Sequence, residues 1–194
     1  MAYCVTDPLI RSQFDRVIFV DDDLIYSPKF LDNFEQPNDD CITQSGNNLD
    51  TSTKYNTSTH IQYGAPPKIR GMSYRFKRAI QLVTGNKVKP SKFTGSGYVQ
   101  LIEGWSGVSI DPLWFDDEIL DIPNEIARAD DVSTSGYLES RGIGIYVPKN
   151  CELPTDNGSS EVNPLKNPKN TNFRPNRVHT RAVEYCMKRW IIWR

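Results

Sequence analysis

The sequence predicts an α/β domain with a mixed, mostly parallel sheet flanked by helices. Apolar runs of strand type alternate along the chain with segments whose apolar residues recur at helical spacing. One run, residues 16–20 (RVIFV), is β-branched and almost wholly apolar, as is typical of a central strand buried on both faces. With 194 residues the chain is long enough for one ordinary domain, so we expect residues 1–194 to fold as a single unit.

Helices are expected where apolar residues recur three and four positions apart. Thr6 or Asp7 can cap the first helix, with Pro8 in its first turn, and Gly142 can end the fifth. The last is the most strongly amphipathic and forms the C-terminal helix. The predicted helices are 8–14, a helix that begins after Ser27 and Pro28, 72–83, 112–120, 131–141 and 177–194.

Further strands are predicted over residues 98–102, 108–110 and 143–147. The polar stretch 36–60 predicts a loop, with one edge strand near residues 59–63. A second long segment, 149–176, is rich in Pro and Asn and has no periodicity, which predicts a flexible loop or lid.

Composition and charge exclude several classes of protein. The net charge of −1 gives no basic surface for nucleic acid or for an anionic membrane. No apolar run approaches the length of a membrane span, and the first residues lack a signal-peptide pattern, so we expect a soluble cytoplasmic protein. Its cysteines are far apart, which predicts buried, reduced thiols rather than a zinc site. They are Cys4, Cys41, Cys151 and Cys186.

Three carboxylates, Asp21, Asp22 and Asp23, follow the strand predicted over 16–20. Ligands of open α/β sheets bind at the carboxyl ends of the strands, and crowded like charges raise one another's pKa. A hard divalent cation such as Mg²⁺ or Mn²⁺ relieves this repulsion, because carboxylate oxygens are its preferred ligands. The alternative is a solvated acidic turn that caps the next helix. The position directly after an apolar strand favours the metal site.

The segment VIFVDDDLIYSP resembles the DxD element of glycosyltransferases with the GT-A fold. In that family the element binds a divalent metal ion, Mn²⁺ or Mg²⁺, that holds the diphosphate of a sugar nucleotide. The resemblance implies that Asp23 ligates the metal. It also implies that Asp21 completes the metal shell or lies near the ribose, and that Asp22 lies beside the bound donor.

A second segment, EGWSGV, resembles the stretch rich in glycine and aromatic residues beside the acceptor pocket of the same family. The resemblance implies that Gly104, Trp105, Ser106 and Gly107 bind substrate. Glycine lets a sugar approach the backbone, and the indole ring can stack on a sugar face. A kinked strand with a core tryptophan is an equally good interpretation of Trp105.

A third segment, ADDVSTSGYL, resembles the acidic pair at a helix start that supplies the catalytic base of inverting members. Asp131 takes the role of the base by this resemblance, and Asp130 supports it. The alternative is helix capping, because Asp is favoured at the N-cap and in the first turn. One Asp can cap while its neighbour points into the cleft.

The family resemblance extends to a histidine near the C-terminus, which completes the metal shell in many members. His179 is the corresponding candidate ligand, since imidazole binds Mn²⁺. An exposed or capping role is the alternative for this side chain.

The resemblance implies metal-dependent transfer of a sugar from a nucleoside-diphosphate sugar to a glycan or other hydroxyl acceptor, with inversion. Two alternatives stay open. One is a haloacid-dehalogenase-type phosphatase, although Ile25 stands where that family prefers Thr or Val. The other is a non-catalytic protein that binds sugar nucleotides or glycans. The DxD element begins at Asp21, so we expect the usual N-terminal nucleoside-binding part to be missing, and the donor cannot be read.

Overall fold

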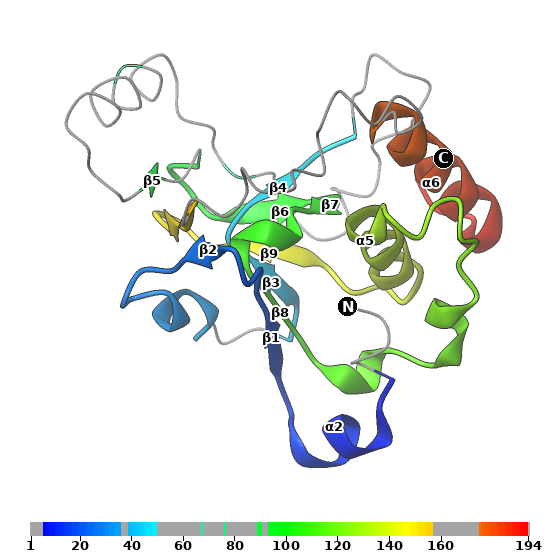
Figure 1. Ribbon diagram of the computed structural model, residues 1–194, viewed down its shortest axis with the longest axis horizontal. Coiled ribbons are helices and arrows are strands. Elements are labelled where there is room, and N and C mark those ends of the chain that lie inside the picture. The colour runs from blue at the N-terminus through cyan, green and yellow to red at the C-terminus, as the bar shows by residue number, and fades with distance from the viewer. Residues whose placement is uncertain are drawn as a thin grey trace.

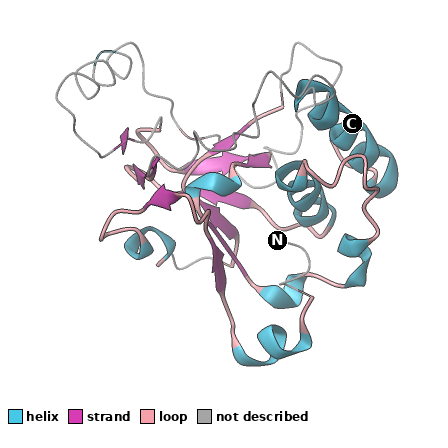
Figure 2. Ribbon diagram, viewed as in Figure 1, coloured by secondary structure: helices cyan, strands magenta, loops and turns pink. Residues whose placement is uncertain are grey.

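The computed structural model describes residues 6–35, 39–49, 67, 76, 89–90, 93–156 and 175–193. At its centre lies a five-stranded sheet, with α5 and α6 at one side (Figures 1 and 2). The strand order across the sheet is β1-β8-β3-β9-β6. These strands are β1 (Val17–Phe19), β8 (Val108–Ile110), β3 (Cys41–Thr43), β9 (Ile145–Val147) and β6 (Gly97–Val99).

The sheet confirms a mixed α/β fold, but the prediction that it is mostly parallel is wrong. Only β3 and β9 pair in parallel, while β1–β8, β3–β8 and β6–β9 are antiparallel. A parallel pair needs a long crossover, usually a helix. The described part of the chain has too few α-helices to supply one crossover for each pair of strands. Its α-helices are α2 (Pro8–Gln13), α5 (Asp130–Ser140) and α6 (Pro175–Trp190). Strand β8 is fully buried although both of its pairings are antiparallel, so burial of a strand does not by itself indicate parallel pairing.

The position of β1 also differs from the prediction. This strand lies at the edge of the five-stranded sheet and is only half-buried, and Val20 after it is 50% exposed. The central strand is β3, which is completely buried within the stretch expected to be a loop. Because β3 is three residues long and flanked by polar residues, its local composition resembles that of a loop.

Six further strands pair in twos around the main sheet. They are β2 (Leu24–Ile25) with β11 (Thr155–Asp156), β4 (Gly46–Asn47) with β7 (Leu101–Ile102), and β5 (Lys89–Pro90) with β10 (Glu152–Leu153). The segment expected to be a loop or lid over 149–176 therefore begins as two short strands, while its residues 157–174 lie outside the described residues.

The predicted helices are partly confirmed. Asp7 caps α2 by accepting the Leu9 N–H at 2.8 Å, and Gly142 follows α5 with a φ of 72°. The predicted helix over 112–120 is instead two 3₁₀ turns, η3 (Pro112–Trp114) and η4 (Asp117–Leu120). The residues after Ser27 and Pro28 likewise form a 3₁₀ turn, η1 (Leu31–Phe34). The predicted strand near 59–63 and, except for the helical Phe76, the predicted helix over 72–83 lie outside the described residues.

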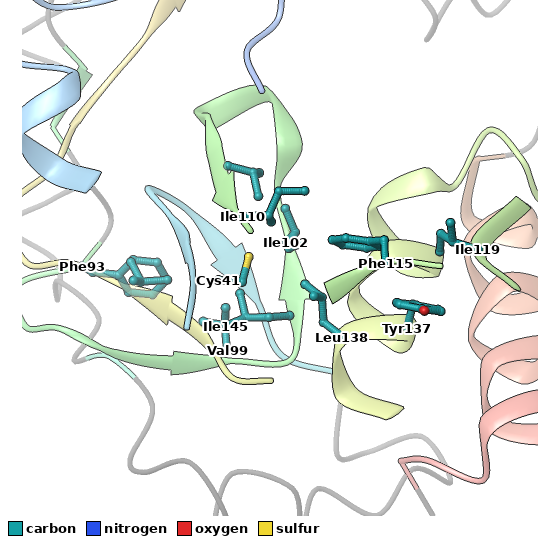
Figure 3. Close-up of a cluster of buried hydrophobic side chains, with 12 residues drawn as sticks. Cys41, Phe93, Val99, Ile102, Ile110, Phe115, Ile119, Tyr137, Leu138 and Ile145 are labelled. Atoms are coloured by element: carbon teal, nitrogen blue, oxygen red, sulfur yellow. The ribbon is translucent and has the colours of Figure 1, made fainter. Parts of the chain in front are cut away.

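The buried core has two parts, one on each side of α5. Figure 3 shows the first, where side chains from the sheet meet Leu138 and Tyr137 of α5. The second lies between α5 and α6 and includes Val132, Ala182 and Cys186. Of the predicted buried thiols, Cys41, Cys151 and Cys186 are buried and free. No helix in the described part of the chain has the length and apolar character needed to cross a membrane.

The close approach of α5 to α6 gives a stability prediction. A methyl group at Gly136 would lie 2.8 Å from Cys186 Sγ and 3.2 Å from Trp190 Cζ3. We expect Gly136→Ala to lower the free energy of unfolding by about 1–3 kcal/mol through overpacking, although Ala is the better helix former by about 1 kcal/mol. Urea titration measures the change. An increase in stability would show that α6 can move away from α5 at little cost.

Candidate functional site

The predicted metal ligands Asp21 and Asp23, with Asp22 predicted to lie beside the donor, are in the loop between β1 and β2, which we call the acidic loop (residues 21–23). Its first residue is held by Tyr26. The Tyr26 hydroxyl accepts the Asp21 N–H at 2.8 Å, and its own hydrogen can be donated to the Asp21 carbonyl at 3.2 Å or to the Trp105 carbonyl at 3.4 Å. The Tyr26 ring packs edge-on against Phe30, with the ring centroids 4.4 Å apart. A side chain thus connects the acidic loop to the segment that contains Trp105.

That segment, residues 103–107, contacts the second acidic pair of the site. Its central part is the 3₁₀ turn η2 (Gly104–Ser106), and the Gly104 N–H donates to Asp131 Oδ2 at 3.1 Å. A methyl group at Gly104 would lie 2.5 Å from Asp131 Oδ1. Position 104 therefore has to be glycine for the Asp131 carboxylate to approach the backbone this closely.

The acidic pair begins α5, as predicted. Asp130 is exposed and Asp131 is half-buried, and Asp130 Oδ1 accepts the Asp131 N–H at 3.1 Å. The N-cap residue is Ala129, and no side chain caps this helix. The capping alternative is thus not what the structure shows, because the Asp131 carboxylate accepts a hydrogen bond from Gly104 instead. Asp131 is one of the two carboxylates in the first turn of α5, where negative charge is favourable.

The pKa values show that the predicted acidic residues lie near one another. The pKa of Asp131 is raised to about 7, mainly by burial, and the Gly104 hydrogen bond opposes this rise. The charges of Asp130, Asp21 and Glu103 raise it further. Burial also raises the pKa of Asp21, and Asp23, Asp130 and Asp22 add to the effect. Asp21–Asp23, Glu103 and the Asp130–Asp131 pair thus form one acidic cluster drawn from three distant parts of the chain.

The remaining predicted substrate-binding residues differ in their exposure. Trp105 is half-buried, whereas Ser106 and Gly107 are buried. The Ser106 hydroxyl donates to the Glu103 carbonyl at 2.8 Å. Gly107 has a φ of 94°, and a methyl group there would lie 2.6 Å from the Phe30 ring. Ser106 and Gly107 therefore shape the turn, whereas Gly104 and Trp105 are only half-buried.

The structure does not bring His179 to the acidic cluster. This histidine is exposed on α6, and Figure 1 shows α6 on the far side of α5 from the acidic loop. Its place near the C-terminus was the only signal for a metal-binding role.

The oxygen ligands of the acidic cluster are of the kind that a divalent cation prefers, but their positions do not form a group of three around one point. Carboxylate oxygens are suitable ligands for Mg²⁺ or Mn²⁺. Among the residues that the structure describes, however, no three His, Cys, Asp or Glu side chains are placed so that they could hold a metal ion. A metal bound at the acidic loop would therefore take some of its ligands from water or from the phosphates of a substrate.

Two contributors to the site were not predicted as site residues. Glu103 is half-buried beside Asp131, and its carboxylate accepts hydrogen bonds from Ser45 Oγ and, at 2.5 Å, from Asn47 Nδ2. Tyr26 is the other, three residues after Asp23. An acidic residue directly before Gly104 was a usable signal for Glu103. Ser45 and Asn47 gave none, because they lie in a long polar stretch.

The chain was compared with protein-family models, with curated proteins and with solved structures, and none of them matches it.

The raised pKa of Asp131 predicts how stability depends on pH. Its folded pKa of about 7 lies above the ordinary value of 3.8, so the folded state binds more protons than the unfolded state between about pH 4 and 7. Stability should therefore fall as pH rises through this interval. Burial raises the pKa of Glu139 to about 7 as well, with the same sign. The free energy of unfolding of Asp131→Asn should decrease less over this pH interval than that of the wild type. We expect the difference to be on the order of 1–2 kcal/mol, because solvent screens the charge of this half-buried side chain.

The measurement is urea unfolding at several pH values for the wild type, Asp131→Asn and the control Glu139→Gln. The two single variants should each flatten part of the curve, and the double variant should flatten both parts. A slope for Asp131→Asn equal to that of the wild type would mean that Asp131 is already ionised at pH 5.

Proposed function

We propose that this protein is a metal-dependent glycosyltransferase of the GT-A type that transfers a sugar from a nucleoside-diphosphate donor to a hydroxyl acceptor with inversion. The observation that carries the proposal is the environment of Asp131. This half-buried carboxylate has a pKa of about 7, accepts a hydrogen bond from Gly104 and lies beside the segment that contains Trp105. A general base works best when its pKa is near the working pH.

Asp131 is the proposed base. Once ionised, its carboxylate accepts the proton of an acceptor hydroxyl as that oxygen attacks the anomeric carbon, and the bond to the nucleoside diphosphate breaks on the opposite face. The Gly104 N–H keeps Oδ2 fixed, so Oδ1 is the oxygen left to accept the proton. Asp130 holds the Asp131 backbone N–H and its charge helps keep the pKa high.

The acidic loop is the proposed donor side. A diphosphate is strongly anionic, and it cannot approach Asp21–Asp23 without a cation between the two groups. Asp21 and Asp23 would hold a Mg²⁺ or Mn²⁺ ion, which when bound supplies positive charge to the leaving diphosphate. Trp105 is the proposed platform for the acceptor sugar, and Gly104 beside it lets the Asp131 carboxylate lie against the backbone next to that platform. The crowding of these carboxylates, whose charges raise the pKa of Asp21, supports this proposal.

Substitution of the base and of the proposed metal ligand separates their roles. Asp131→Asn should lower the rate of transfer by about 100-fold or more, with donor affinity unchanged, because only the proton acceptor is lost. Asp23→Ala should instead abolish Mn²⁺-dependent binding of the donor. Asp117→Asn, on the exposed turn η4, is the matched control and should behave like the wild type.

The assay follows release of nucleoside diphosphate from a panel of UDP- and GDP-sugars, with Mn²⁺ or Mg²⁺ and simple sugars as acceptors. Calorimetry measures binding of the same donors. Full activity of Asp131→Asn would overturn the assignment of the base. Release of phosphate from a generic phosphate ester would favour the phosphatase. Binding of donor without turnover would favour a non-catalytic protein.

The pH profile provides an independent check of the base. Asp131 acts only when ionised, so kcat/KM should rise with pH and level off above a pKa near 7. A profile that is flat from pH 5 to pH 8 would assign the proton transfer to another group.

A further inference from the structure

We propose that Tyr26 is a positioning residue that fixes the acidic loop, the donor side, against the segment carrying Gly104 and Trp105, the acceptor side. The inference rests on the proposed function but concerns a residue to which that proposal gives no role. Tyr26 and Trp105 are 79 residues apart along the chain. Their contact therefore fixes the positions of two distant parts of the site relative to each other.

The backbone of Asp21 is held by the Tyr26 hydroxyl. Both backbone polar groups of Asp21 contact the Tyr26 hydroxyl, the N–H at 2.8 Å and the carbonyl at 3.2 Å. Strand β1 ends at Phe19 and β2 begins at Leu24, so the sheet ladders do not include residues 20–23. The Tyr26 hydroxyl is thus the anchor of the acidic loop between its two flanking strands.

Tyr26 also connects the acidic loop to the acceptor side, through Trp105. The hydrogen of the Tyr26 hydroxyl can also reach the Trp105 carbonyl at 3.4 Å. Trp105 follows Gly104, whose N–H holds Asp131. A chain of contacts therefore runs from Asp21 through Tyr26 and the Gly104–Trp105 backbone to the proposed base.

Ring contacts hold Tyr26 itself in place. Its ring packs on Phe30, which is buried, and Phe30 packs on Phe34 with centroids 5.1 Å apart. The next residue, Ser27, donates to Glu152 Oε2 at 2.5 Å. Because β2 also pairs with β11, the backbone on the far side of the loop is held independently of the hydroxyl. Loss of the hydroxyl alone should release residues 21–23 without unfolding the chain.

This geometry predicts a specific kinetic effect. The donor would still bind the acidic loop, and the acceptor would still bind beside Trp105, but the two would no longer be aligned. We expect Tyr26→Phe to lower kcat by about 10- to 100-fold, since small misplacements of reacting groups have effects of this size. The KM for the donor should stay within about threefold of the wild-type value, because the ligating side chains are intact.

Tyr98→Phe is the matched control. Its hydroxyl also donates to a partly buried acceptor, Asp40 Oδ2 at 2.8 Å, but Tyr98 lies on β6, at the edge of the five-stranded sheet opposite β1. Both variants remove one phenolic hydroxyl and keep the ring. The amide NMR spectrum of each variant, compared with that of the wild type, shows whether the fold is preserved.

A second measurement does not depend on turnover. Hydrogen exchange of the Asp21 amide, followed by NMR on the wild-type chain and both variants, reports its hydrogen bond to Tyr26. We expect exchange to become about tenfold faster in Tyr26→Phe and to stay unchanged in Tyr98→Phe. If the wild type transfers no sugar from any donor, the proposed function fails, and the exchange data still test the anchor.

Unchanged exchange at Asp21 in Tyr26→Phe would overturn the anchor. A wild-type kcat for Tyr26→Phe, or an equal loss of kcat in Tyr98→Phe, would overturn its role in positioning. Faster exchange together with a lower kcat in Tyr26→Phe alone is the result that supports the inference.

Discussion

The contact between Gly104 and Asp131 is the constraint on which the arrangement of the site depends. It joins the start of α5 to the turn that follows β7, and it brings the backbone within hydrogen-bond distance of a half-buried carboxylate. Ser135, one helical turn further along α5, reinforces the same junction. Its hydroxyl donates to the Asp131 carbonyl at 2.5 Å and accepts the Ile102 N–H at 2.9 Å. The direction of α5, and with it the position of Asp131, is therefore fixed by the strand beside it.

The cluster of negative charge has a cost that the rest of the structure must offset. Partial burial makes the charged form of the Asp131 carboxylate less stable, which is why its pKa rises to about 7. Glu103 has different contacts, because its carboxylate accepts hydrogen bonds from the side chains of Ser45 and Asn47. Two neighbouring carboxylates thus have different environments, because Asp131 accepts a backbone N–H whereas Glu103 accepts two side-chain donors.

Local features of the fold were predictable because they depend on neighbouring residues. Asp7 with Pro8 indicated the start of α2, Gly142 the end of α5, and the amphipathic pattern of the last segment predicted α6. The direction of the strands was not predictable. It depends on which distant segments pair, and a short apolar strand such as β8 has the same sequence pattern in a parallel and in an antiparallel sheet.

The site shows the same division between local and distant information. Asp21–Asp23 and the Asp130–Asp131 pair could be selected because runs of carboxylates beside predicted strands and helices are visible in the sequence. Their proximity, and the roles of Tyr26, Ser45 and Asn47, follow only from the three-dimensional pairing. Conversely, His179 was selected for its place in the sequence, but it lies on α6, and Figure 1 shows α5 between α6 and the loop that joins β1 to β2.

The edge position of β1 explains why a site of this kind needs side-chain anchors. A loop after a central strand is confined by ladders on both sides, whereas β1 is hydrogen-bonded to a strand of the sheet on one side, to β8. The acidic loop therefore gains its position from Tyr26 on one flank and from the β2–β11 pairing on the other. These anchors act on the backbone, so the carboxylates of Asp21 and Asp23 stay available for the one or two protein ligands that Mg²⁺ commonly uses together with phosphate oxygens.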